Sequence, residues 1–237
     1  MAVVAVIEGL GTAETEWGEW LAGASWPSVA PGGFEFPVVV APHPDDEILG
    51  VGGLLASTGR AEIVAVTDGE ASHPHTTVVT PDDLIRLRPE ESRQALDRLG
   101  VDARTHRLRQ PDGGIDEAAL TDALVWLLAP GRQCLATWRG DGHPDHEAVG
   151  RAAATACART GAVLWEYPIW MWHWTRPDDP RVPWDRAHRV PLDPAVVPVK
   201  AHAIDAFATQ IADIDGVTIL PPHVLARFAR PFEVLFR

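Results

Sequence analysis

Cysteine is scarce in this chain of 237 residues, in which only Cys134 and Cys157 occur. Neither belongs to a paired motif, and each falls in a stretch predicted to be buried, an apolar strand around Cys134 and an alanine-rich helix around Cys157. Both thiols are therefore expected to pack in the core rather than to form a disulfide or bind a metal.

Lysine is scarcer still, because Lys200 stands alone beside nineteen arginines. We attribute this bias toward arginine, alanine and proline to a GC-rich bacterial genome rather than to function. Positive charge is in deficit overall, and the formal net charge is -13 at pH 7. An acidic surface disfavours nucleic acid and anionic membranes as the main partners.

Long apolar runs are also missing, and none approaches the length of a membrane span. Residues 1–8 lack the basic start of a signal peptide, so the cytoplasm is the expected location. The chain is 46% hydrophobic and 22% charged, which is typical of a globular protein, and it is long enough for one sizeable domain.

Apolar, β-branched runs alternate with helical patterns from Pro37 onwards. The runs at 38–41, 63–67 and 135–138 predict buried strands. This alternation predicts an α/β fold, a single-domain, Rossmann-like and mostly parallel sheet with helices on both faces. Residues 37–237 are expected to form this domain, and residues 1–36 an N-terminal appendage of one short helix and a loop. The predicted helices cover residues 14–21, 47–57, 82–99, 117–128 and 145–159.

Carboxylates and histidines are dense directly after two of the predicted strands. Residues 41–47 contain His43 and three consecutive acids, and residues 141–147 contain His143 and His146. Adjacent like charges repel one another, and their burial is costly unless a cation compensates. Because ligands bind beyond the carboxyl ends of parallel strands, the two clusters are expected to form one metal site there.

Further short motifs follow these clusters in a fixed order. They occupy residues 42–47, 49–50, 52–53, 67–70, 88–91, 111–113, 143–146 and 166–168, with Lys200 and Gln210 after them. Together they resemble the PIG-L/LmbE-like family of zinc-dependent N-acetylglucosaminyl deacetylases. The resemblance covers residues 37–237 in the family's order and leaves residues 1–36 outside.

The resemblance implies the roles of the metal ligands and the base. His43, Asp46 and His146 would hold one zinc ion per chain, with one position left open. The donor set alone does not exclude iron, manganese or cobalt. Asp45 would accept a proton from the attacking water; a helix cap or a hydrogen-bond partner of a ligand is the alternative for it. Glu47 is expected to stabilise the following helix through its dipole.

His143 and Asp145 complete the expected catalytic group. Amide hydrolysis needs positive charge near the carbonyl oxygen. We expect His143 to supply it as an imidazolium and to protonate the leaving amine. Asp145 is expected to orient that ring and to hold its proton, and a capping role is the alternative.

Contacts to the substrate are less constrained by the sequence. The resemblance places a sugar-contacting arginine at Arg88, and Asp112 is a candidate for binding hydroxyl groups; a surface salt bridge is the alternative for each. The proline-broken segment 165–184 is rich in tryptophan. Trp170 and Trp172 are candidates for an aromatic wall against a sugar, and covering the edge of the core is the alternative. His73 and His75 are expected to be solvated loop residues.

The leading hypothesis is a zinc-dependent hydrolase that removes an N-acyl group, most simply acetyl, from an amino sugar or from a glycoside or metabolite that carries one. A nucleotide-binding oxidoreductase is disfavoured, because residues 43–46 replace the glycine-rich turn and would repel a pyrophosphate. A non-catalytic carbohydrate- or metabolite-binding relative is the alternative. Inositol, malate or lipid conjugates, free disaccharides and secondary metabolites all stay open as substrates, and the oligomeric state is not indicated.

Overall fold

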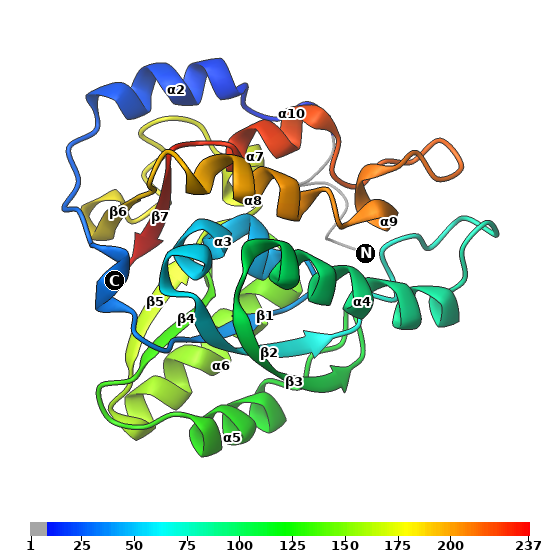
Figure 1. Cartoon of the computed structure of the whole chain (residues 1–237), viewed down its shortest axis with the longest axis horizontal. Helices are drawn as coiled ribbons and strands as arrows, with labels where there is room; N and C mark the ends of the chain where they lie inside the picture. Colours follow the sequence, from blue (N-terminus) through cyan, green and yellow to red (C-terminus); the bar gives the residue numbers. More distant parts are fainter. Residues whose placement is uncertain (1–8) are drawn as a thin grey trace.

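One mixed sheet organises the part of the chain that the structure describes, residues 9–237 of a computed structural model (Figure 1). Within that part, seven strands lie in the order β3-β2-β1-β4-β5-β7-β6. Strands β1 to β5 pair in parallel with one another, whereas β7 pairs antiparallel with both of its neighbours, β5 and β6. The strands are β1 (Val38–Ala41), β2 (Arg60–Thr67), β3 (Asp102–Gln110), β4 (Gln133–Thr137), β5 (Val163–Tyr167), β6 (Ala187–Pro191) and β7 (Phe232–Phe236).

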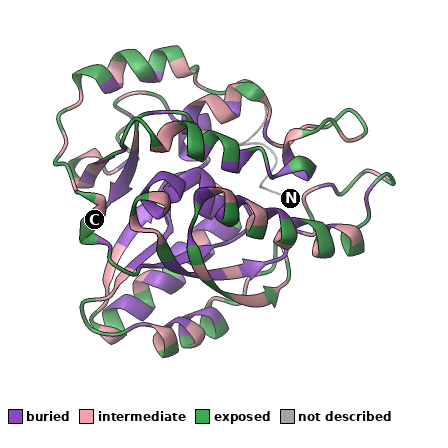
Figure 2. Ribbon diagram, viewed as in Figure 1, coloured by how far each residue is buried: buried purple, intermediate pink, exposed green. Residues whose placement is uncertain are grey.

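Helices cover both faces of the sheet. Helices α3, α4 and α8 lie on one face, and α5 and α6 lie on the other (Figure 1). In β1, Val39 joins the core on the α3 side, whereas Val38 and Val40 join the core on the α5–α6 side. Figure 2 shows this burial on the central strands and on the helix faces turned toward them. The predicted α/β, Rossmann-like fold is therefore confirmed.

The helix boundaries follow local sequence signals. Thr80 and Asp83 form a capping box at the start of α4, and Gly100, with φ +71°, ends it. The helices are α2 (Glu14–Gly23), α3 (Asp46–Thr58), α4 (Pro81–Leu99), α5 (Glu117–Leu127), α6 (Pro144–Thr160), α7 (Met171–Trp174), α8 (Val196–Ile204), α9 (Ala208–Ile211) and α10 (Pro222–Leu225), with 3₁₀ turns at Pro31–Gly33, Trp184–Arg186 and Ala226–Phe228.

The N-terminal segment packs on the main core. The helix expected near residues 14–21 is present as α2, and its Trp17 is fully buried. The Trp17 indole donates to the carbonyl of Trp172 at 2.8 Å. A domain boundary at residue 36 stays a prediction, and residues 1–8, on which the expectation about a signal peptide rests, lie outside the described residues.

The cysteines behave as predicted, because both are free and buried in the core between β4 and α6. Among residues 9–237, no helix is long and apolar enough to cross a membrane.

The feature of the fold that matters for function is the adjacency of β1 and β4, which are parallel neighbours. The chain continues from β1 to one side of the sheet and from β4 to the other, so the loops after them meet at a topological switch point.

Candidate active site

The three predicted metal ligands come together at this switch point. His43 lies in the β1–α3 loop, Asp46 begins α3, and His146 lies in the first turn of α6. The Asp46 Oδ2 atom is 3.3 Å from both His43 Nδ1 and His146 Nε2. The donor atoms of all three residues lie within 4.8 Å of one another. His146 Nε2 is buried and has no hydrogen-bond partner, which suits a metal ligand better than a packed side chain.

Asp141 orients His146, although the sequence motifs assign no role to Asp141. Its fully buried carboxylate accepts from His146 Nδ1 at 2.8 Å. It also accepts the backbone N–H groups of Ile169, Trp170 and Met171 at 2.9 to 3.0 Å. The proton on Nδ1 leaves the Nε2 lone pair free to face Asp46. The available signal was an acid five residues before His146 in the same cluster.

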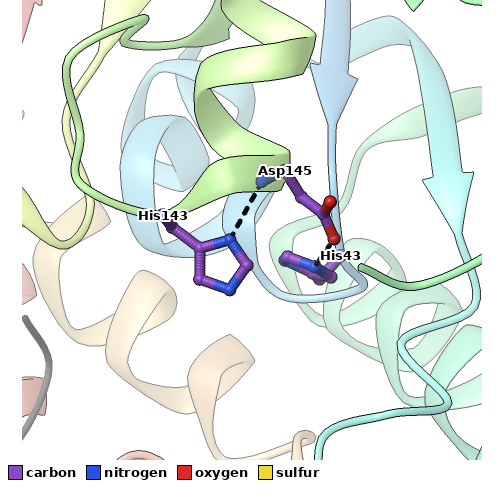
Figure 3. A group of neighbouring side chains, drawn as sticks. All are labelled: His43, His143 and Asp145. Carbon is purple, nitrogen blue, oxygen red and sulfur yellow. Dashed lines mark hydrogen bonds and ion pairs between the residues drawn. The ribbon is translucent and has the colours of Figure 1, made fainter. Parts of the chain in front are cut away.

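His43 is held in the same way by two carboxylates. Its Nε2 atom is 3.2 Å from Asp145 Oδ2 (Figure 3). The same atom is 3.3 Å from Asp112 Oδ1. A proton on Nε2 leaves Nδ1 free to face Asp46. Asp112 also accepts from the Ala71 N–H at 2.8 Å, and its contact with His43 puts it inside the site rather than in a surface salt bridge.

The surrounding charges favour a cation at this position. Burial lowers the pKa of His146, but the carboxylates of Asp46 and Asp141 raise it to about 9. Burial lowers the pKa of His43 as well, and its carboxylate neighbours raise it well above the ordinary value. Burial raises the pKa of Asp46, yet its two histidine neighbours hold it well below the usual range. A metal ion would compete with protons for these histidines.

Asp45 is a buried carboxylate beside the predicted metal ligands. Its backbone has φ +150°, a conformation that residues with a side chain rarely adopt. Burial raises the pKa of Asp45 to about 7, although the positive charge of Arg88 acts in the opposite direction. Glu47 accepts from the Asp45 N–H at 3.2 Å and from the Ser92 hydroxyl. Glu47 therefore supports the strained residue in addition to lying in the first turn of α3.

The contacts of Arg88 differ from the expectation. Arg88 is only 2% exposed, so its guanidinium does not face a substrate. It donates to Asp45 Oδ2 at 3.1 Å, to Pro44 O at 3.0 Å and to Gly69 O at 2.9 Å. A direct contact to a sugar is not supported by this geometry, because the guanidinium already binds Asp45, Pro44 and Gly69.

His143 also differs from the expectation. It caps the N-terminus of α6, and its Nδ1 accepts from the backbone N–H of Asp145 at 3.2 Å. The carboxylate of Asp145 contacts His43 instead (Figure 3). It also accepts from the Gly113 N–H at 2.8 Å. Burial lowers the pKa of His143 to about 2, and positive charge on His146 and His43 acts in the same direction. The structure thus favours a neutral His143, with its proton on Nε2, over an imidazolium held by Asp145.

The tryptophan-rich segment acts mostly as structure. Trp172 is 3% exposed. Its ring centroid is 5.0 Å from that of Trp17 and 4.0 Å from the guanidinium carbon of Arg230. This position argues against a contact of Trp172 with a substrate. Trp170 is partly exposed and contributes its backbone N–H to Asp141. His75 is exposed as expected, whereas His73 is buried next to the Ser72 hydroxyl, contrary to the expectation.

Solved structures share the overall fold at low sequence identity. The deacetylase Dbv21, which acts on the A40926 pseudoaglycone, is 24% identical, with a TM-score of 0.61 over 86% of this chain and 96% of that chain. The N,N'-diacetylchitobiose deacetylase from Pyrococcus horikoshii is 19% identical, with a TM-score of 0.60 over 76% of this chain and 72% of that chain. GalB, the 4-carboxy-2-hydroxymuconate hydratase from Pseudomonas putida KT2440, is 18% identical, with a TM-score of 0.57 over 82% of each chain. At these identities the likeness establishes the fold and not the reaction.

A sequence comparison with curated proteins found no match. The comparison with family models does find one, over residues 38–157, and that stretch includes β1, β4 and the whole of both clusters of acids and histidines, residues 41–47 and 141–147. Since this match spans half of the sequence, the chain belongs to the PIG-L family, whose description is GlcNAc-PI de-N-acetylase.

Proposed function

We propose that this protein is a zinc-dependent hydrolase that removes an N-acyl group, most simply acetyl, from an amino sugar or a glycoside that carries one. One observation carries the proposal: Asp46 Oδ2 lies 3.3 Å from both His43 Nδ1 and His146 Nε2, beside the buried Asp45. Membership of the PIG-L family supports the same reaction class.

His43, Asp46 and His146 would hold the ion. Two observations support the fit: the buried His146 Nε2 atom lacks a hydrogen-bond partner, and the second nitrogen of each histidine faces a carboxylate. Two imidazoles and one carboxylate suit zinc and leave a position open. When bound, a divalent cation supplies Lewis-acid polarisation of a carbonyl and lowers the pKa of a water molecule.

Asp45 is the proposed general base. Arg88 and Glu47 hold its carboxylate and its backbone, and burial brings its pKa to about 7, near the optimum for a base that works at neutral pH. His143 is proposed to donate its Nε2 proton toward the carbonyl oxygen of the substrate. Asp145 orients two of the three histidines. Its N–H donates to His143 Nδ1, and its carboxylate contacts His43 Nε2.

The substrate class follows from the family and from the two deacetylases of similar fold, one named for a disaccharide and one for a glycopeptide pseudoaglycone. We propose an N-acetylated glycoside as the substrate, with Asp112 and the partly exposed Trp170 as its first candidate contacts. GalB is named as a hydratase, so the fold alone does not fix the reaction.

Acetate release tests this proposal. The purified protein is stripped with a chelator, reloaded with one equivalent of zinc, and incubated with a panel of N-acetylated mono- and disaccharides and glycosides. We expect acetate release that depends on reloading and is lost in the Asp45→Asn variant. Zinc binding and sugar binding without any acetate release would instead support the non-catalytic alternative.

A further inference from the structure

Lys200, the only lysine, is a motif residue that the proposed function leaves without a role. It lies in α8 and is 3% exposed. Its Nζ atom donates to Glu233 Oε1 at 2.7 Å and to the carbonyl oxygen of Leu49 at 2.8 Å. Glu233 belongs to β7 and is 5% exposed, so a buried ion pair joins α8, β7 and α3.

This ion pair lies where helix α3 is interrupted. Val51 has φ −137° and ψ 18°, which breaks the helix between its first turn and its second half. In a regular helix the Gly53 N–H would donate to the Leu49 carbonyl. Here the Gly53 N–H donates to Glu233 Oε1 at 2.7 Å, and the Leu49 carbonyl accepts from Lys200. The two side chains are thus inserted into the helical ladder.

A second bond strengthens the insertion, because the Leu54 N–H donates to Glu233 Oε2 at 2.9 Å. The interruption lies in a closely packed part of α3. A Cβ on Gly50 would lie 2.2 Å from the ring of Tyr167, and a Cβ on Gly53 would lie 2.5 Å from Leu192. Helix α3 is therefore fixed in position by close packing as well as by the ion pair.

The first turn of α3 connects the ion pair with the proposed metal site. The Leu49 N–H donates to the carbonyl oxygen of Asp45 at 2.9 Å, and Asp46 is the next residue. Leu49 therefore links the two sites, because its carbonyl accepts from Lys200 and its N–H donates to Asp45. We propose that the Lys200–Glu233 pair is a positioning device that sets the orientation of this turn, and through it the placement of Asp45 and Asp46. This inference rests on the proposed metal-dependent function.

The chemistry of the pair agrees with a positioning role. Two apolar residues would avoid the cost of removing two charges from water. They would also leave the Leu49 carbonyl and the Gly53 N–H buried without partners, which is itself costly. The compact ammonium of Lys200 has three donors, so it contacts the Leu49 carbonyl and the Glu233 carboxylate at once.

Two variants and one control test the inference. Glu233→Gln and Lys200→Met each remove one charge, and zinc affinity is measured by competition with a chromophoric chelator, together with kcat and KM. We expect zinc binding to weaken by about 10- to 100-fold, the range seen when groups that orient metal ligands are removed. We also expect kcat to fall more than KM changes. Glu62→Gln is the matched control, because Glu62 is 6% exposed, pairs with Arg132 at 3.1 Å and lies beside Val38 at the opposite end of β1.

A measurement on the unmodified protein covers the case in which the variants do not fold. If the pair and the metal site are coupled, zinc binding must slow amide hydrogen exchange at Gly53 and Leu54. Exchange is compared between zinc-loaded and chelated protein, with the amides of α5 as the reference. Zinc binding that is unchanged in both variants, or exchange at these two amides that does not respond to zinc, overturns the inference and leaves the proposed function intact. A wild-type protein that binds no zinc overturns both.

Discussion

At the scale of single residues, the site is built around one strained aspartate. Asp45 has φ +150°, a conformation that costs free energy and persists only when its surroundings enforce it. Arg88 binds its carboxylate and the carbonyl before it, while Glu47 binds its N–H group. Strain that is held by three buried contacts points to a functional reason for the geometry.

We predict that Asp45→Asn retains zinc and loses most activity. The amide preserves the shape of the side chain but cannot accept a proton, and removal of a general base costs about 10²- to 10⁴-fold in rate. In the wild type, activity requires the ionised carboxylate, so the rate should fall as pH decreases through a pKa of about 7, or through a lower value once a cation lies beside it. A pH–rate profile with parallel zinc analysis checks this. Near-normal turnover of Asp45→Asn would assign the base elsewhere, with Glu47 as the next candidate.

Arg88→Lys should separate the two interpretations of Arg88. Lysine cannot reproduce the three contacts of the guanidinium to Asp45, Pro44 and Gly69. We expect kcat to fall by on the order of 10²-fold with little change in KM, since a displaced catalytic group costs about that much. Arg86→Lys on the exposed face of α4 is the control and should change neither value. An effect confined to KM would restore the predicted sugar contact.

At the scale of helices and strands, the sequence predicted the elements that are buried on both faces. The apolar runs of β1 and β4 were found because parallel central strands leave no polar face. Strand β3 was missed because it is the edge of the sheet, is largely exposed and carries a polar sequence. The antiparallel strands β6 and β7 were also missed, and β6 is the other edge of the sheet and only partly buried.

The loop after β2 offers a prediction at this scale. Gly69 and Gly100 have nearly the same conformation, with φ +70° and +71°. A Cβ on Gly69 would lie 1.9 Å from Arg88 Nη1, whereas a Cβ on Gly100 would meet no atom within 4 Å. Gly69→Ala and Gly100→Ala therefore carry a similar backbone cost of about 1 kcal/mol. Only Gly69→Ala should also displace Arg88.

Thermal unfolding and activity measurements distinguish these two variants. We expect both to lower the melting temperature, Gly69→Ala by more, and only Gly69→Ala to reduce kcat. Equal activity in the two variants would mean that Arg88 can move aside without disturbing Asp45.

At the scale of the whole molecule, the topology brings the ligands together and the packing decides where each side chain points. The predicted set His43, Asp46 and His146 converged because β1 and β4 are neighbours in the sheet. The spacing of these residues along the chain did not indicate where their side chains point. Arg88 points toward Asp45, which lies 43 positions away in the chain. The Asp145 carboxylate points toward His43, which lies 102 positions away. Trp172 likewise packs against a distant residue, Trp17 of helix α2, which precedes the predicted domain.

The distribution of charge also predicts how the stability of the whole protein depends on pH. Without a metal, protonated His146 pairs with Asp46 and Asp141, which raise its pKa to about 9 from an ordinary value of 6.5. A raised folded-state pKa adds stability that is fully present below about pH 6.5 and is lost as pH rises through about 9. Zinc requires the neutral imidazole, so bound zinc replaces the proton and its stabilisation does not decline over this range. We therefore expect the melting temperature of chelated protein to fall between pH 6.5 and 9, by about 2–4 °C for each kcal/mol lost, while that of zinc-loaded protein stays nearly constant. Parallel curves for the two forms would show that the histidines are not exchanging a proton for the metal.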